Sequence, residues 1–508
     1  MPTTLMTPGV YVEEKNAFPS SAVAVETAVP VFIGYTEKAE WNGKSLVRKP
    51  TRIASFAEYV ENFGGGFNPK FTIAPPADPA SKPETFSLNG TQMEVKINAN
   101  NTAYLFNSIR LFYANGGSNC YILSVGTYGA SANAEGANSG IEIKAQDFIG
   151  STDNPVSAFD LLEKEYEPTI VVIPDIIALG KDAYVSVYTK VLEHCGKVQS
   201  RIGIFDLRKQ GPGEKTEDLV GEFRDAIGVN FLSYGAAYYP WLKTTIVSSD
   251  ELNFENLDDS FDLEASLPEN DAKEVVKKFK ANKTPDDNTK KNYHQSLKAS
   301  SPTYLNILEE IRSKLNELPP SGAMAGTYTM VDNTRGVWKA PANVSVNMVN
   351  APSINITNEQ QQSLNVDVMA GKSINVIRPF PGIGTLVWGG RTLEGNSQDW
   401  RYINVRRTAI MIEQSLKLSA RAYVFEPNDA GTWITVKSMI TNFLTNLWKQ
   451  GALAGAVPEQ AFNVQIGLGV TMTPNDILDG IMKITVQVAI VHPAEFIVIT
   501  FQQLQQQS

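Results

Sequence analysis

The sequence contains little of the material from which enzymes and metalloproteins build their sites. Its 508 residues include two cysteines, Cys120 and Cys195, and three histidines, His194, His294 and His492. Two cysteines far apart in sequence exclude a disulfide scaffold and a paired CxxC zinc site. Three scattered histidines leave little for a metal site or a histidine-based catalytic centre. We therefore expect no catalytic residues, no metal site and no cofactor.

Long apolar runs and an excess of positive charge are also absent. No run of 18 apolar residues is present, which argues against a membrane-spanning helix. No apolar segment of the kind found in secretory signals follows the first cation, Lys15. The net charge is −10, and no basic block dominates the chain, so nucleic-acid binding is not expected. These absences predict a protein that folds in a cytoplasm without inserting directly into a membrane.

The chain nevertheless has enough apolar material to fold. Apolar residues make up 43% and charged residues 19% of the sequence, so a large core can be buried and a wholly disordered chain is excluded. A length of 508 residues predicts about two to four domains.

Strand and helix patterns alternate between residues 155 and 240. Continuously apolar runs predict three strands, and amphipathic segments predict three helices, which in chain order lie at 157–165, 169–173, 182–195, 202–205, 216–227 and 231–239. Apolar strands that alternate with helices indicate a parallel sheet covered by helices. The predicted fold class is α/β in this region and α+β overall.

Two segments differ from this pattern and are interpreted as insertions, near 64–102 and near 245–318. The first is rich in proline and asparagine, with a hairpin predicted at Asn89-Gly90. In the second, residues 250–318 include 15 acidic and 10 basic side chains among 69. Helices are predicted at about 271–280 and after Ser301, which precedes Pro302. Because burying so many charges is costly, we expect this segment to project into solvent.

Residues 371–508 are predicted to form a further compact unit. Helices are expected at 401–420 and 433–450, and strands at 481–491 and 496–501. The second helix carries one apolar stripe and is followed by Gly451, a typical helix stop. Arginines and acidic residues are interspersed in this unit, which favours ion pairing over nucleic-acid binding.

The best enzymatic signal is a pair of strand-end carboxylates, Asp175 and Asp206. Open α/β sheets often place functional groups at the carboxyl ends of their strands. An α/β hydrolase that uses these carboxylates is therefore the alternative hypothesis. The segment 211–216 is not a phosphate-binding loop, because Glu214 stands where such a loop needs glycine.

Segments along nearly the whole chain resemble the tail sheath proteins of contractile phages and of phage-tail-like contractile injection systems. The segments that carry this resemblance are TPGVYVEE (7–14), VFIGYTEKA (31–39), IRLFYANGGSNCYILSVG (109–126), PTIVVIPD (168–175), RIGIFDL (201–207), AAYYPWL (236–242), PPSGAMAGTYTMVDNTRGVWKAPAN (319–343), NVIRPFPGIGTLVWGGRTL (375–393), WRYINVRR (400–407), VFEPND (424–429), GALAGAVPEQAF (451–462) and HPAEFIVITF (492–501).

The resemblance implies a structural polymer rather than an enzyme. Such subunits stack as rings in a helical sheath around an inner tube, and the sheath contracts to drive the tube through a target cell envelope. It implies an N-terminal arm at 1–20, a sheath α/β domain at 21–370 that contains both insertions, and a C-terminal sheath domain at 371–508 with an arm at 495–508. The middle domain would be subtilisin-like without a catalytic triad, since Ser321 has no histidine in a plausible triad context.

The resemblance also suggests interaction residues and partners. We expect the extended terminal strands to be donated to neighbouring subunits, and the tube to be contacted by Lys437 and Lys449. The residues assigned to the donated strands are Val10, Tyr11, Val12, Phe496, Ile497, Val498 and Ile499. The implied partners are further copies of the chain, an inner tube protein, baseplate and terminal cap proteins, and sheath paralogues. The implied location is a phage virion tail, or a released or cell-anchored injection particle, assembled in the bacterial cytoplasm.

Overall fold

A computed structural model of the chain describes residues 22–79, 83–97, 102–128, 141–152, 155–367 and 369–499. These residues divide into two compact units. The large unit comprises Glu26–Ile410 together with 492–499, and the small unit comprises Met411–Val491 together with 22–25. The boundary at residue 410 falls inside helix α14 (Ile403–Ala420). After the small unit, the chain therefore returns to the large one.

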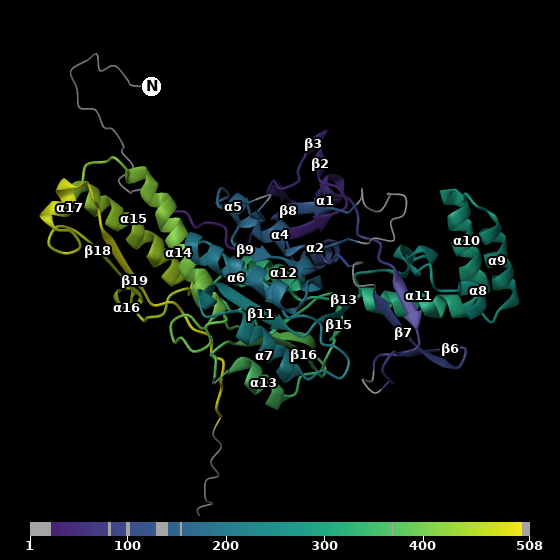
Figure 1. Cartoon of the computed structure of the whole chain (residues 1–508). Helices are drawn as coiled ribbons and strands as arrows, with labels where there is room; N and C mark the ends of the chain where they lie inside the picture. Colours follow the sequence, from purple (N-terminus) through teal and green to yellow (C-terminus); the bar gives the residue numbers. More distant parts are fainter. Residues whose placement is uncertain are drawn as a thin grey trace, which may run out of the picture. The chain divides into compact units, whose positions relative to one another are not determined.

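The large unit is built on a nine-stranded, mostly parallel sheet (Figure 1). Its six inner strands, β16 to β8, pair in parallel, while β17, β14 and β4 pair antiparallel at the two ends. In spatial order the strands are β14 (Val344–Ser345), β17 (Gly384–Trp388), β16 (Ile374–Phe380), β11 (Gly235–Tyr239), β10 (Ile202–Asp206), β9 (Ile170–Val172), β1 (Pro30–Thr36), β8 (Cys120–Thr127) and β4 (Thr51–Ile53).

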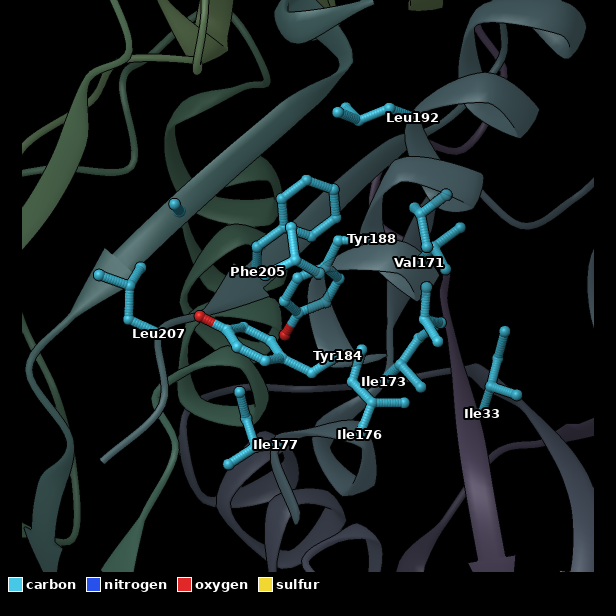
Figure 2. Close-up of a cluster of buried hydrophobic side chains, with 14 of the residues drawn as sticks. Ile33, Val171, Ile173, Ile176, Ile177, Tyr184, Tyr188, Leu192, Phe205 and Leu207 are labelled. Carbon is cyan, nitrogen blue, oxygen red and sulfur yellow. The ribbon is translucent and has the colours of Figure 1, made fainter. Parts of the chain in front are cut away.

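Helices cover both faces of this sheet, as continuously apolar strands require. The first core contains side chains from α4 (Ala145–Ile149), α5 (Ala158–Leu162), α6 (Lys181–Val198) and α7 (Thr216–Ala226). Figure 2 shows part of it, where the Tyr188 and Phe205 rings stack with centroids 4.3 Å apart. The second core contains side chains from α1 (Phe56–Phe63), α2 (Leu105–Ala114) and α12 (Ser321–Arg335).

Two glycines allow α12 to pack unusually close to α2. A Cβ atom added to Gly322 would lie 2.4 Å from the carbonyl oxygen of Ser108, and one added to Gly326 would lie 2.4 Å from that of Phe112. These glycines are four residues apart and therefore share one helix face. Any larger residue at either position would push the two backbones apart.

The two predicted insertions fold together. Side chains from 71–95 and from 252–311 form one buried cluster, separate from the cores that flank the sheet. Figure 1 shows the corresponding helices beside β6 and β7. The elements are β5 (Phe71–Ala74), β6 (Phe86–Leu88), β7 (Thr91–Ile97), η4 (Ser249–Glu251), η5 (Phe254–Asn256), α8 (Leu263–Ser266), α9 (Asn270–Ala281), α10 (Asp287–Ser300) and α11 (Pro302–Leu315). We call residues 69–97 with 249–315 the insertion module.

Short elements complete the large unit. They are the hairpin of β2 (Glu40–Trp41) and β3 (Lys44–Ser45), the small sheet of β13 (Glu317–Leu318), β12 (Leu242–Thr244) and β15 (Val349–Pro352), the helix α13 (Asn358–Asn365), and the 3-10 turns η2 (Pro174–Ala178) and η3 (Leu232–Tyr234).

The small unit packs helices against a two-stranded antiparallel sheet. The strands are β18 (Phe462–Ile466) and β19 (Ile484–Val488). The helical elements are the C-terminal part of α14, η6 (Arg421–Tyr423), α15 (Ala430–Lys449), α16 (Pro458–Ala461) and α17 (Pro474–Leu478).

The structure confirms most of the predicted elements. The β–α alternation of the middle region is present as β9, α6, β10, α7 and β11. Asn89 and Gly90, both at positive φ, form the hairpin turn between β6 and β7. The Ser301 hydroxyl accepts a hydrogen bond from the Tyr304 backbone N–H and so caps α11.

One predicted element begins later than expected, and one helix was not predicted. The strand predicted at 231–239 begins only at residue 235, because Phe231 adopts a positive φ and η3 follows it. Helix α10 was not expected, since only Tyr293, His294 and Leu297 on it are buried. Residues 496–499 pair with no strand among the described residues, and their donation to a neighbouring subunit stays a prediction.

Candidate functional site: assembly surfaces and strand-end carboxylates

Asp175 lies in η2, directly after β9, and its carboxyl group joins β1 to the start of helix α2. Its Oδ2 accepts a hydrogen bond from the Tyr35 N–H at 2.8 Å, and its Oδ1 accepts bonds from the Tyr104 and Leu105 N–H groups at 2.6 and 2.9 Å. The latter two groups lie at the start of α2, where a helix has unpaired N–H groups. Burial raises the pKa of Asp175 to about 6, although these three bonds act in the opposite direction. The residue is fully buried and braces a helix.

Asp206 plays the same part for helix α12. Its Oδ1 accepts a hydrogen bond of 2.7 Å from the Ser321 N–H at the start of the helix. Burial raises the pKa of Asp206 to about 7, and its contact with Ser321 lowers it in part. Within the described ranges no histidine is hydrogen-bonded to either residue. Both strand-end carboxylates are therefore buried structural groups, and neither opens onto a substrate site.

In the loop at 211–216, which lacks the glycine of a phosphate-binding loop, the Glu214 side chain forms an ion pair. The Arg208 guanidinium binds the Glu214 carboxylate through both terminal nitrogens and also reaches Glu222 at 2.8 Å. Among the described residues no group of three or more cysteine, histidine or acidic side chains is placed to hold a metal ion. In the same ranges no helix is both long and apolar enough to cross a bilayer.

The sheet of β18 and β19 has two unpaired edges among the residues that the structure describes. Phe462 pairs with Val488 at one end and Ile466 with Ile484 at the other. In the described part of the chain the two strands form a sheet by themselves. A two-stranded sheet is only marginally stable unless further strands or a packed helix support it. Its edges offer backbone N–H and C=O groups to an added strand.

The C-terminal segment after the hairpin is apolar and exposed. Phe496, Ile497, Val498 and Ile499 have relative exposures of 70, 79, 88 and 70%. Four consecutive apolar residues so exposed are a liability for a free subunit, because they can pair and aggregate. The preceding residue, Glu495, is by contrast held firmly by Arg391 through a contact of 2.6 Å.

Helix α15 separates an apolar face from a polar one. Its buried stripe contains Val436, Met439, Ile440, Phe443, Leu444 and Leu447. Trp433, also predicted in this stripe, is half-buried and donates its indole N–H to Asn428. Lys437 and Lys449 are both exposed, and neither has a hydrogen bond or an ion pair within the described ranges.

Only some of the predicted interaction residues lie among the described residues. Val10, Tyr11 and Val12 lie outside the described residues. Sequence reasoning missed the pair Arg391–Glu495, because 104 positions separate the two residues and no local pattern connects them. Two arginines of the predicted C-terminal unit form ion pairs inside the large unit. Arg391 pairs with Glu495, and the Arg407–Asp332 pair at 2.6 Å is 3% exposed on both sides.

Comparison with known proteins confirms the resemblance inferred from the sequence. Residues 396–503 match the family described as the phage tail sheath C-terminal domain. The tail sheath protein of Salmonella phage ViI is 27% identical over 150 residues, which cover 29% of this chain and 23% of that protein. The tail sheath protein of Burkholderia phage BcepMu is 28% identical over 142 residues, covering 27% and 29%. The match thus spans about a quarter of each of these two relatives.

Solved structures match over nearly the whole chain. The contracted sheath complex of an extracellular contractile injection system, PVC, superposes with a TM-score of 0.59 and 28% identity over 99% of this chain and 98% of that one. The contracted helical sheath of the anti-feeding prophage gives 0.59 and 29%, over 98% and 100%. A chain in the baseplate structure of the same prophage gives 0.59 and 28%, over 99% and 100%. The fold is that of contractile sheath subunits, and these relatives are structural proteins.

Proposed function

We propose that the chain is the structural subunit of a contractile sheath, polymerises as a helical stack of rings around an inner tube, and contracts to drive that tube through a target cell envelope. The observation that carries this proposal is the match over 99% of the chain with a contracted sheath subunit. The hydrolase alternative has no support in the geometry, because Asp175 and Asp206 are both fully buried and hold helix N-termini.

The proposal is tested by electron microscopy of the purified chain in negative stain. Striated tubes are expected, because a sheath subunit carries the contacts that stack its rings. Monodisperse globular particles at every concentration and ionic strength tried would contradict the proposal.

The terminal arms are proposed to link neighbouring subunits by strand exchange. The exposed apolar run at 496–499 and the two-stranded sheet of β18 and β19 support this, since within the described ranges the run pairs with no sheet and the sheet has no further strand. Backbone hydrogen bonds to an added strand can persist while side-chain interfaces slide during contraction. The N-terminal residues Val10, Tyr11 and Val12 are proposed to act as a second donated strand.

The exchange of the C-terminal arm is tested by deleting residues 496–508. Deletion removes the donated strand, so we expect folded subunits that do not polymerise, measured by sedimentation and microscopy with circular dichroism as the control for folding. Replacement of Val498 and Ile499 by proline removes two backbone donors and should have the same effect. Sheaths of normal length from the truncated chain would rule out exchange at this end.

The polar face of α15 is proposed to contact the inner tube. Lys437 and Lys449 are exposed and have no acidic partner in the described part of their own chain, so their charges are available to acidic groups on a tube protein. Changing both to glutamate should weaken co-assembly with the tube, more strongly at low salt. The matched control makes the same charge change at Lys278 and Lys283, two exposed lysines of the insertion module. Equal co-assembly of the two double variants would remove the proposal.

The remaining partners and the location follow from the same proposal. The charged segment 250–318 is proposed to project from the outer surface of the sheath. Baseplate and terminal cap proteins, and sheath paralogues, are proposed to bind the ends or neighbouring rings of the polymer. Assembly is proposed to take place in the bacterial cytoplasm, before the sheath becomes part of a phage tail or an injection particle.

A further inference from the structure

The carboxylate of Glu495 is surrounded by hydrogen-bond donors of the large unit. Arg391 Nε lies 3.0 Å from Oε1 and 3.1 Å from Oε2, and its Nη2 lies 2.6 Å from Oε2. The Tyr402 hydroxyl donates to Oε2 at 3.0 Å, and the Asn365 side-chain amide donates to Oε1 at 2.7 Å. The side chains of Arg391 and Glu495 are 4% and 20% exposed. A forked, shielded pair of this kind is stronger and more directional than a surface ion pair.

Arg391 is itself fastened to the central sheet. Its backbone N–H donates to the side-chain oxygen of Asn375 at 2.8 Å, and its carbonyl accepts from the Asn375 amide at 2.7 Å. Asn375 belongs to β16 and also donates to the carbonyl of Ala237 in the neighbouring strand β11. A force applied at Glu495 is therefore passed through Arg391 and Asn375 to two adjacent strands of the nine-stranded sheet.

Among the described residues no hydrogen bond follows Glu495, although Phe496 and Ile497 still line a pocket of the large unit beside Trp388. Residues 496–499 pair with no strand in the described part of the chain, and all four side chains are at least 70% exposed. One largely shielded, multiply bonded residue thus stands directly before an exposed apolar segment. That arrangement is expected where a segment must stay attached at its root while its tip is offered to another molecule.

We infer that the Arg391–Glu495 pair is the anchor of the C-terminal arm, so that the segment exchanged with a second copy of the chain begins at residue 496 and its load is borne by the nine-stranded sheet. The inference rests on the proposed sheath function. Glu495 is a positioning residue in this scheme. It contributes the fixed root from which the exchanged strand leaves, and it makes no contact with the second copy itself.

The anchor is tested first in the free subunit, by the mobility of a spin label on the exposed position 494 in Ala494→Cys, since the native Cys120 and Cys195 are buried. In Glu495→Ala the label should tumble at least twofold faster than in the parent chain, because the neighbouring side chain is no longer held. Arg391→Lys should have a similar effect, because an ammonium group cannot make the forked contact. Since both changes remove one interaction, the label in the double variant should be no more mobile than in either single variant.

The second measurement is made on assembled sheaths. With the anchor removed, we expect sheaths at least twofold shorter than those of the parent chain after equal mechanical shearing, measured by microscopy. Glu459→Ala, at an exposed position on α16, is the matched control and should leave the length unchanged. Unchanged mobility of the label at 494, or unchanged length after shearing, would overturn the inference. If the parent chain forms no sheath, the proposed function fails, and the label measurement still tests the anchor.

Discussion

Because of Asp206, we expect the large unit to lose stability as the pH rises, whereas a salt-bridged carboxylate makes a protein lose stability as the pH falls. Burial raises its pKa from 3.8 to about 7, so between these values the folded chain holds a proton that the unfolded chain has released. Stability therefore falls as the pH rises through this window, by about 1.4 kcal/mol per pH unit. Above a pH of about 7 the fall ends, because both states are then ionised.

The substitution Asp206→Asn isolates this effect. The asparagine oxygen can still accept the bond from the Ser321 N–H, and its amide nitrogen takes the place of Oδ2, which has no hydrogen-bond partner among the described residues. Asp175 has the same sign of shift, but its pKa is raised only to about 6. Between pH 6 and pH 8 the parent chain should therefore lose about 1.4 kcal/mol more stability than the variant does.

The assay is urea unfolding of the dilute, unpolymerised subunit at pH 6 and pH 8, followed by tryptophan fluorescence. Other titrating groups are common to both proteins and cancel in the difference. Asp175→Asn serves as the contrast. Its amide would turn a donor toward one of three backbone N–H groups, so it should be less stable at both pH values by about 1–3 kcal/mol. An equal loss of stability from pH 6 to pH 8 in the parent chain and in Asp206→Asn would refute the reasoning.

Two further predictions concern the large unit. Asp332→Ala leaves the buried Arg407 guanidinium without its carboxylate. The loss should lower the free energy of unfolding by about 3–5 kcal/mol. A melting temperature equal to that of the parent chain would contradict this prediction. Deletion of 249–314 alone strips one side from the core of the insertion module and should give aggregated protein, whereas deletion of 249–314 together with 70–97 should give soluble, folded protein. A short linker can join the ends left by deleting 249–314, because Val247 and Asn316 are hydrogen-bonded at 2.9 Å. Equal solubility of the two deletion variants would show that residues 70–97 and 249–314 do not share a core.

Local sequence signals predicted those elements whose causes are themselves local. Ser301 followed by Pro302 marks the start of α11, because a hydroxyl cap and a proline at the first turn suit a helix N-terminus. Asn89-Gly90 predicts its hairpin because both residues tolerate positive φ. The apolar runs that became β9 and β10 have no polar face, so they had to be buried on both sides in a covered sheet.

The function was also within reach of the sequence, through its resemblance to a family rather than through a site. The scarcity of histidine and cysteine removed most catalytic and metal chemistry. Asp175 and Asp206 remained ambiguous, because a strand-end aspartate has the same sequence context whether it faces a substrate or a helix N-terminus. Only their burial and their backbone partners decided for the structural role.

Long-range contacts were settled by the tertiary structure alone. The two insertions share one core although more than 150 residues separate them. No sequence pattern in either insertion indicates that it packs against the other. Glu495 contacts Arg391 because the chain returns from the small unit to the large one. Hydrophobic periodicity does not predict this return of the chain. The sequence by itself determined the elements and the family likeness, since these depend on neighbours along the chain. The bonds of Asp175 and Asp206 to helix N-termini, the core shared by the two insertions, and the Arg391–Glu495 pair depend instead on which distant groups the folded chain brings into contact.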